Sequence, residues 1–210
     1  MPLQLVSPAP DTWSTYQQSL KDFLGSDAEY KLPDTWSTYE QSVLDFLGRH
    51  DAEFKLYHLP VGTLDLVALA NGATLRDVVP SGGRFFATWG HGTAASCEMT
   101  NPTRNGLAAF RNFVQGDAVA AAFARITEAE GLATVQTGSF ELNFLSIPGI
   151  FLEALHLRCS ADGIDLVLPV LSGYSQLPTD AVLDADAFLA QARAIATARL
   201  AQPTSSDLSS

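Results

Sequence analysis

The stretch that most constrains the fold is residues 134–171, the densest apolar block of the chain. Apolar Phe140, Leu142 and Phe144 alternate with polar residues in its first part. Because side chains on a strand alternate between two faces, this period of two predicts a β-strand with one buried face.

Two further apolar runs follow within the block. Pro148-Gly149 interrupts the first pattern, and the runs 151–159 and 164–170 flank a turn that contains an Asp-Gly pair. Such a pair between apolar runs is a strong hairpin signal, since glycine adopts positive φ without steric cost. The block therefore predicts a three-stranded antiparallel meander. The alternative is a helix over 149–159, which would make a strand–helix–strand unit.

The N-terminal part contains a tandem duplication. Residues 10–32 recur at 33–56 with one inserted residue, and 18 of 23 positions are identical. Each copy begins with Pro-Asp, a helix-capping signal, and ends its helical pattern at a glycine. Apolar residues at helical spacing form one stripe per copy: Trp13, Tyr16, Leu20, Phe23 and Leu24 in the first, and Trp36, Tyr39, Val43, Phe46 and Leu47 in the second.

Two copies are too few for a repeat solenoid, which needs about three or more units. We expect the second copy to belong to a single α+β domain over 33–201, with 1–32 as an N-terminal extension and 202–210 as a flexible tail. The apolar stripe of the first copy should not remain in water. It packs on the second helix, or it is a partner-binding surface that docks on a neighbouring molecule, or it competes with the second copy for the same position in the domain.

Residues 53–99 read as up to five short strands. Asn71-Gly72 predicts a hairpin between 64–70 and 73–79, and a short helix from Thr63 to a Gly72 cap is the alternative. The Pro- and Gly-rich segment 80–83 predicts the next reversal. Two alternating runs, 84–89 and 94–99, then predict a second hairpin.

Helical patterns occupy much of the remaining sequence. Residues 107–114 are amphipathic in outline, and Asp117 begins a run of strong helix formers that ends before Gly131. A final alanine-rich helix is predicted from Thr179 or Asp180 to about Ala201. Its expected buried side is made of Val182, Leu183, Phe188, Leu189, Ala192, Ile195 and Ala196.

The predicted fold class is therefore α+β, with an antiparallel sheet of meanders and hairpins packed against helices. We expect the helices to cover mainly one face of the sheet. The other face would then expose Phe86, Leu145, Ile147 and Leu152, which favours a homodimer. This order of elements over 33–200 is similar in outline to small secretion-chaperone-like α+β proteins. That resemblance carries no motif, and it implies a dimer that binds segments of partner proteins.

The charge of the chain limits its partners. The net charge is −11 and the sequence pI is about 4.6, which argues against nucleic acid and anionic membranes as ligands. No apolar run is long enough to cross a bilayer, and the first residues lack the pattern of a signal peptide. We therefore expect a cytoplasmic protein, in which Cys97 and Cys159 are buried thiols rather than a disulfide.

The first candidate for chemistry is the segment from Trp89 to Glu98. His91 lies between two glycines and can titrate near neutrality, and Cys97 follows shortly after. These residues could line a pocket with Trp89. On a hairpin, however, Cys97 would lie four residues from the turn, with Glu98 on the opposite face, so His91 also reads as an ordinary turn residue.

The second candidate is His156, which lies near Glu153 and Arg158 on an expected core strand. A lone histidine there is more often a hydrogen-bonded structural residue. No helical metal motif, cysteine pair or phosphate-binding loop occurs, and His50 and His58 lack the local spacing of a zinc site. The acidic residues Asp180, Asp184 and Asp186 are better explained by the start of a helix than by calcium. The sequence predicts no cofactor and no metal.

No catalytic signature names a reaction, and an enzyme is the less favoured interpretation. We expect a non-enzymatic acidic protein-binding or assembly module of the adaptor or chaperone type, acting through apolar helix and sheet surfaces. One alternative is a small-molecule-binding protein or enzyme with a pocket near His91, Cys97 and Trp89. Another is a structural subunit of a larger homomeric assembly.

Overall fold

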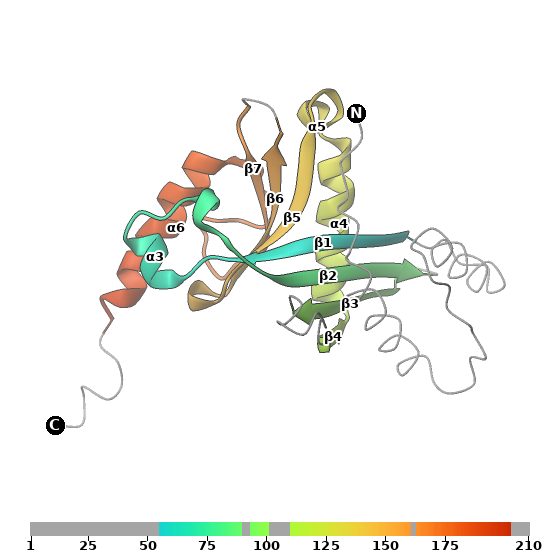
Figure 1. Ribbon diagram of the computed structural model, residues 1–210, viewed down its shortest axis with the longest axis horizontal. Helices are drawn as coiled ribbons and strands as arrows, with labels where there is room; N and C mark the ends of the chain where they lie inside the picture. Colours follow the sequence, from blue (N-terminus) through green and yellow to red (C-terminus); the bar gives the residue numbers. More distant parts are fainter. Residues whose placement is uncertain (1–54, 90–92, 101–109, 161–162, 203–210) are drawn as a thin grey trace. The chain divides into compact units, whose positions relative to one another are not determined.

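The computed structural model describes residues 55–89, 93–100, 110–160 and 163–202 (Figure 1). These residues form an α+β structure with a mostly antiparallel sheet, in agreement with the predicted fold class. The two helices predicted in the tandem repeat lie outside the described residues. No helix in the described part is both long and apolar enough to span a membrane.

The chain divides into two compact units. Unit 1 comprises the described residues within Gly62–Pro80 and Ala129–Ser210, and unit 2 comprises those within Gln4–Val61 and Ser81–Glu128. The prediction of one domain over 33–201 stays a prediction, and each unit is described separately below.

Unit 1 contains the predicted meander. Its strands are β5 (Phe140–Ile147), β6 (Leu152–Cys159), β7 (Leu166–Leu171) and the short β8 (Leu183–Asp184), hydrogen-bonded in that order. The pairings are antiparallel, with Leu142 opposite Leu157 and Leu155 opposite Leu168. The three-stranded meander is confirmed, and the alternative helix over 149–159 is wrong. A single 3₁₀ turn, η2 (Pro148–Ile150), connects β5 to β6 instead.

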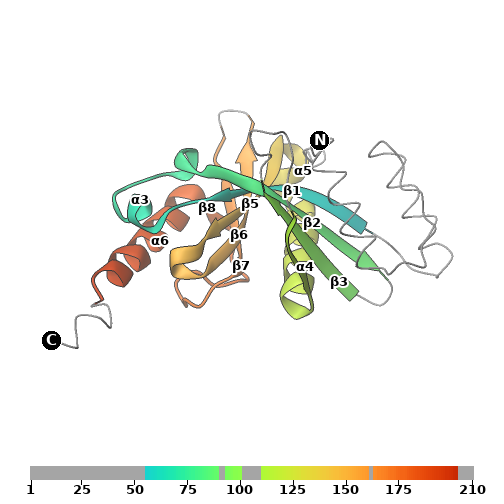
Figure 2. The same cartoon turned by 60° about the horizontal axis from the view of Figure 1, so that its bottom comes forward.

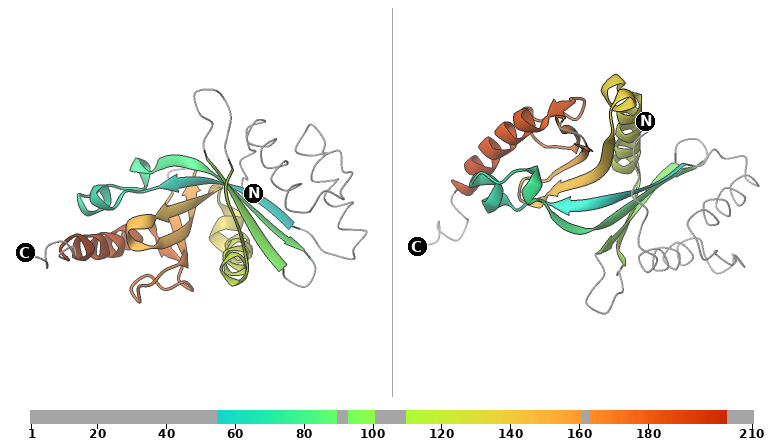
Figure 3. Two further views of the ribbon diagram at one scale, coloured as in Figure 1. Left: turned by 90° about the horizontal axis from the view of Figure 1, so that it is seen from below. Right: turned by 45° about the horizontal axis from the view of Figure 1, so that its top comes forward.

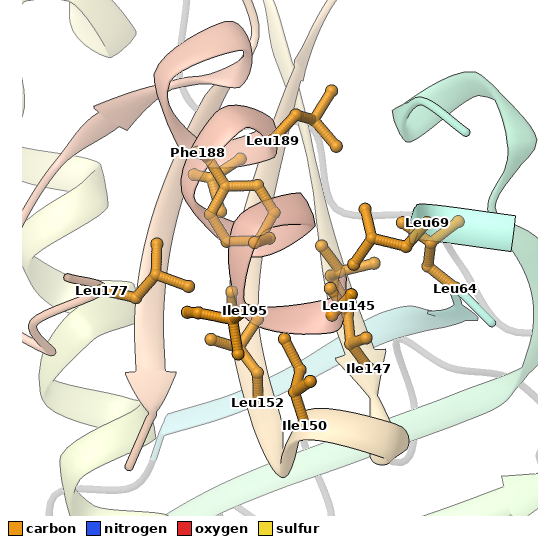
Figure 4. Packing of buried hydrophobic residues seen from close by; sticks show 14 of the residues in the cluster. Leu64, Leu69, Leu145, Ile147, Ile150, Leu152, Leu177, Phe188, Leu189 and Ile195 are labelled. Atoms are coloured by element: carbon orange, nitrogen blue, oxygen red, sulfur yellow. The ribbon is translucent and has the colours of Figure 1, made fainter. Parts of the chain in front are cut away.

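A hydrophobic core lies between these strands and two helices of the same unit (Figure 4). Helix α6 (Ala185–Leu200) contributes Phe188, Leu189, Ala192, Ile195 and Ala196, all predicted to be buried. Helix α3 (Leu66–Ala70) lies beside α6 in Figures 1 and 2 and contributes Leu69. A further short helix, α5 (Ala133–Thr137), precedes β5.

This core corrects the expectation of an open sheet face. Leu145, Ile147 and Leu152 are at most 1% exposed and pack in the cluster with α6, and Phe86 of unit 2 is also buried. Because one face of β5 and β6 is covered by α6, the apolar residues that favoured a homodimer are already buried within the chain. The dimer itself stays a prediction.

Helix α3 replaces the hairpin predicted around Asn71-Gly72. The Asp65 side chain accepts hydrogen bonds from the backbone N–H groups of Val67 and Ala68, both at 2.9 Å, and thereby caps the helix. Gly72 follows the helix with φ of +97°, so its positive φ ends a helix rather than turning a hairpin. Arg193 of α6 donates to the carbonyls of Gly72 and Ala73. The alternative short helix is therefore confirmed, and a 3₁₀ turn, η1 (Leu75–Asp77), follows it.

Unit 2 holds the strand order β4-β3-β2-β1. The strands are β1 (Lys55–Thr63), β2 (Val79–Trp89), β3 (Thr93–Thr100) and β4 (Phe110–Gln115), and helix α4 (Asp117–Gly131) follows them. The hairpin of β2 and β3 and the helix that begins at Asp117 are confirmed. The helix predicted over 107–114 is wrong where the structure describes it, because residues 110–115 pair with β3 as a strand.

The reversal predicted at 80–83 is also wrong, because β2 runs straight through it. Gly83 pairs with Met99 of β3, and a Cβ atom on Gly83 would lie 2.5 Å from Nε2 of His58. Glycine is therefore needed here for close approach rather than for a turn. His58 also contacts the ring of Phe85, with 4.6 Å between ring centroids.

Helix α4 packs on the face of the unit 2 strands that carries Tyr57, opposite to the face of the His58 contact. Its Phe123 meets Tyr57 of β1 edge to face, with 5.2 Å between ring centroids, and Figure 3 shows the helix on one side of these strands. Strands β2 and β3 are also joined by a cross-strand ion pair of Arg84 and Glu98 at 2.7 Å. Because Arg84 alternates with Phe85 along β2, this pair faces away from the His58 contact.

The last helix begins later than predicted. Residues 183–184 form β8, whose Leu183 lies opposite Val167 of β7, and α6 starts at Ala185. Asp184 caps it by accepting a hydrogen bond from the N–H of Ala187 at 2.7 Å. The strand pairing with β7 therefore displaces the start of the helix, and Val182, predicted to be buried, is 39% exposed.

Candidate functional site

Strand β6 connects two unusual features of unit 1. The first is Phe151, which follows the 3₁₀ turn η2 and is 71% exposed. Its backbone is left-handed, with φ of 49° and ψ of 44°, and its N–H donates to the carbonyl of Pro148 at 3.1 Å. Among the described residues, it is the non-glycine residue with a positive φ. A left-handed aromatic residue costs conformational energy, which glycine would avoid.

The neighbours of Phe151 hold it in this position. Ile150 and Leu152 on either side are 0% and 1% exposed, and both belong to the core cluster. Gly149 lies so close to α3 that a Cβ atom there would be 2.6 Å from Cβ of Leu66. The turn is therefore anchored on both sides, and the Phe151 side chain extends outward from a fixed backbone.

Two other side chains lie at the same end of the β6–β7 ladder. Glu153 follows Phe151 by two residues and pairs with Leu171 of β7, which is 49% exposed. We call Phe151, Glu153 and Leu171 the Phe151 surface. It combines exposed apolar groups with a carboxylate, an arrangement typical of contact surfaces.

The second feature is His156, the sequence candidate on β6. It is buried, and its Nε2 lies 2.8 Å from Oδ2 of Asp165. The other carboxylate oxygen of Asp165 accepts the backbone N–H of Cys159 at 2.9 Å. Asp165 therefore uses both oxygens to join the end of β6 to the segment that begins β7.

The burial of His156 favours its neutral form. Burial lowers the pKa of His156 below its ordinary value of 6.5, and this effect outweighs the opposing hydrogen bond and charge of Asp165. Arg158, two residues further on the same face, lowers the pKa slightly more, although it forms an ion pair with Glu141 of β5. A neutral imidazole that donates from Nε2 to the carboxylate fits this geometry.

The chemistry available around His156 is limited. Cys159 is a free thiol, but three residues along a regular strand place it on the opposite face from His156. Within the described ranges, no group of three or more potential metal ligands occurs. The histidine thus has an orienting carboxylate but no nucleophile in reach on its own face of β6, and the pair reads as a structural hydrogen bond.

The structure describes only some of the other sequence candidates. His91 and the predicted partner-binding residues Trp13, Tyr16, Leu20, Phe23 and Leu24 lie outside the described residues, as does His50. Cys97 pairs with Phe85, while Trp89 lies four residues further along β2, which corresponds to about 13 Å. The backbone therefore separates Cys97 from Trp89 along the same hairpin.

Sequence reasoning missed Phe151 and Asp165. Phe151 appeared as the first residue of an apolar run, and the Pro-Gly before it was the signal of an irregular connection. Asp165 lies nine residues from His156, so no local spacing links them. Its position directly after a predicted turn was the available signal, because polar residues there commonly bind backbone groups.

No protein-family model matches the chain, and searches of curated proteins and of solved structures found no significant match.

Proposed function

We propose that this protein is a non-enzymatic protein-binding module that holds a partner segment on the Phe151 surface. The observation that carries the proposal is Phe151 itself, an aromatic side chain that is 71% exposed on a left-handed backbone. Stability of the fold does not account for this residue, since glycine would fit the backbone better. Aromatic residues, phenylalanine included, are enriched in the cores of protein interfaces.

The chemistry of the partner follows from the surface and the charge of the chain. The apolar groups of Phe151 and Leu171 suit an apolar side chain, and Glu153 follows Phe151 by two residues and lies opposite Leu171. The chain as a whole carries a net charge of −11. Complementary charge steers association, so the partner is a protein segment with an apolar residue beside lysine or arginine. The same negative charge disfavours an anionic lipid surface.

The test uses a random peptide display library selected on the full chain. We expect the enriched peptides to combine apolar and basic residues. Their affinity, measured by fluorescence anisotropy, should fall about tenfold or more in Phe151→Gly, as for the loss of an aromatic anchor. This variant should also gain about 1 kcal/mol of stability by relieving the left-handed backbone, so weaker binding could not be attributed to unfolding.

Ile164→Ser is the matched control. Ile164 is 69% exposed, close to the value for Phe151, but it lies in the turn at the other end of β6. We expect this variant to bind the selected peptides as the unchanged protein does. Equal binding by Phe151→Gly, or no enrichment of peptides, would overturn the proposal. So would Phe151-dependent binding to phosphatidylcholine or phosphatidylserine vesicles, which would indicate a membrane surface instead.

A further inference from the structure

The strands of unit 2 bury side chains on both faces. Helix α4 lies on the face that carries Tyr57, and Figure 3 shows it on one side of these strands. The opposite face carries His58, Gly83 and Phe85, which lie against one another and are also buried, Phe85 to 1% exposure. We call these three residues the His58 face.

The burial of the His58 face requires a covering layer. Apolar side chains on a sheet face are enclosed when a second layer of secondary structure packs against that face. Among the described residues of unit 2, the elements are the four strands, which form the layer to be covered, and α4, which lies on the other side. The described part of this unit therefore supplies no second layer over Phe85.

The chain that leads into β1 is suited to supply this layer. The second repeat copy ends at Lys55 and Leu56, which are the first two residues of β1, and His58 follows two positions later. Residues 48–54 join β1 to the end of the helix predicted in this copy, and a segment of this length spans at most about 25 Å. The predicted helix, with its apolar stripe, is therefore held within reach of the His58 face.

The two repeat copies differ at the margin of this stripe. Four of the five stripe positions are identical, and the fifth is Leu20 in the first copy and Val43 in the second. Beside the stripe, the second copy has Leu44 where the first has Lys21. A wider apolar stripe buries more apolar surface and brings no charge that must be desolvated. The second copy is therefore the favoured occupant of an apolar site, and the first copy keeps the side chains needed to fill it.

We propose that the His58 face is a docking site for one repeat helix, which residues 34–47 occupy and which residues 11–24 of the same chain occupy instead when the second copy is weakened. The first copy needs the longer connection 25–54, but loop-closure entropy grows only slowly with length. The inference does not depend on the proposed partner-binding function, since the Phe151 surface belongs to unit 1.

Fluorine NMR of the full chain labelled with 5-fluorotryptophan tests which copy is docked. The chain contains three tryptophans, Trp13, Trp36 and Trp89, so single substitutions by phenylalanine assign each resonance. We expect the Trp36 resonance to show the small solvent isotope shift of a buried ring. In Trp36→Ala, the Trp13 resonance should move to the position that Trp36 has left, because the first copy takes the vacated site. A Trp13 resonance that stays in place would overturn the exchange.

A substitution in the site itself tests where the helix docks. Phe85→Leu removes a ring from the His58 face and should shift the Trp36 resonance. Phe144→Leu is the matched control, because Phe144 is equally buried but lies on β5 in unit 1, and it should leave the Trp36 resonance in place. No shift in Phe85→Leu, or an equal shift in both variants, would overturn the docking site.

Thermal unfolding gives a second measurement that needs no label. Because either copy fills the site, Trp13→Ala and Trp36→Ala should each lower Tm only slightly. The double variant leaves no intact copy, so its Tm should fall by at least about twice the sum of the two single shifts. Gln18→Ala and Gln41→Ala, at equivalent positions on the polar side of the predicted helices, should give additive shifts. Additive shifts for the tryptophan pair, or the full loss in Trp36→Ala alone, would show that the first copy does not replace the second.

Discussion

Apolar side chains are usually buried and polar side chains exposed, and the two ends of β6 depart from this rule in different ways. At the start of the strand, an aromatic residue is exposed on a strained backbone, and near the end a histidine is buried with a carboxylate. The buried pair is explained within the chain, because Asp165 satisfies both the histidine and a backbone N–H. Phe151 gains nothing comparable from its own fold. This difference is the basis for our proposal that the first end binds a partner, whereas the polar contacts of the second end lie within the protein itself.

The sharpest test of this comparison uses two adjacent residues. Ile150 is 0% exposed within the core cluster, so Ile150→Ala should lower the free energy of unfolding by about 3 kcal/mol through lost burial and a cavity. Phe151→Ala should change it by less than about 0.5 kcal/mol, since its side chain is exposed. Urea denaturation followed by circular dichroism measures both. A large loss in Phe151→Ala would mean that this side chain stabilises the fold, and the contrast would disappear.

The second test addresses the buried end. Asp165→Ala removes the acceptor of both His156 and the Cys159 N–H, and should destabilise the protein by about 2 kcal/mol. Asp165→Asn retains one carbonyl oxygen and should lose less. Thermal unfolding at neutral pH compares the two variants. If both unfold at the same temperature as the unchanged protein, the carboxylate is not a structural link.

The smallest expected effect concerns the ion pair of Arg158 with Glu141. Arg158 is 60% exposed where it pairs with Glu141, so Arg158→Gln should cost less than about 0.5 kcal/mol. The same denaturation experiment at low and high salt measures this change. A cost as large as that of Asp165→Ala would place the important electrostatic contact at Arg158 rather than at Asp165.

The meander of unit 1 could be predicted because its signals are local. Phe140, Leu142 and Phe144 alternate strictly, and a proline and an Asp-Gly pair separate the runs. All three of these residues are buried as expected. One candidate, His156, was also recognised in advance as a hydrogen-bonded residue of a core strand. Its partner Asp165 was not, because only the pairing of β6 and β7 brings them together.

The predictions that failed rest on signals with two meanings. Asn71-Gly72 suits both a tight hairpin and the end of a helix, and the capping bonds of Asp65 decide for the helix. The glycines at 82–83 suggested a turn, but position 83 requires a glycine because His58 lies against it. Residues 110–115 carry an amphipathic pattern, but pairing with β3 makes them a strand. Contacts with distant residues select the conformation at Gly83 and at residues 110–115, whereas the Asp65 cap is local to α3.

The sequence by itself determined the α+β class, the meander and the helix that begins at Asp117, because apolar periodicity and turn residues act over a few positions. Only the tertiary structure decided which polar groups are satisfied inside and which apolar group stays outside. The reason is that burial depends on surfaces supplied by distant segments. The environments of Phe151 and Asp165 depend on α3, α6 and β7. None of these elements is adjacent to both residues along the chain.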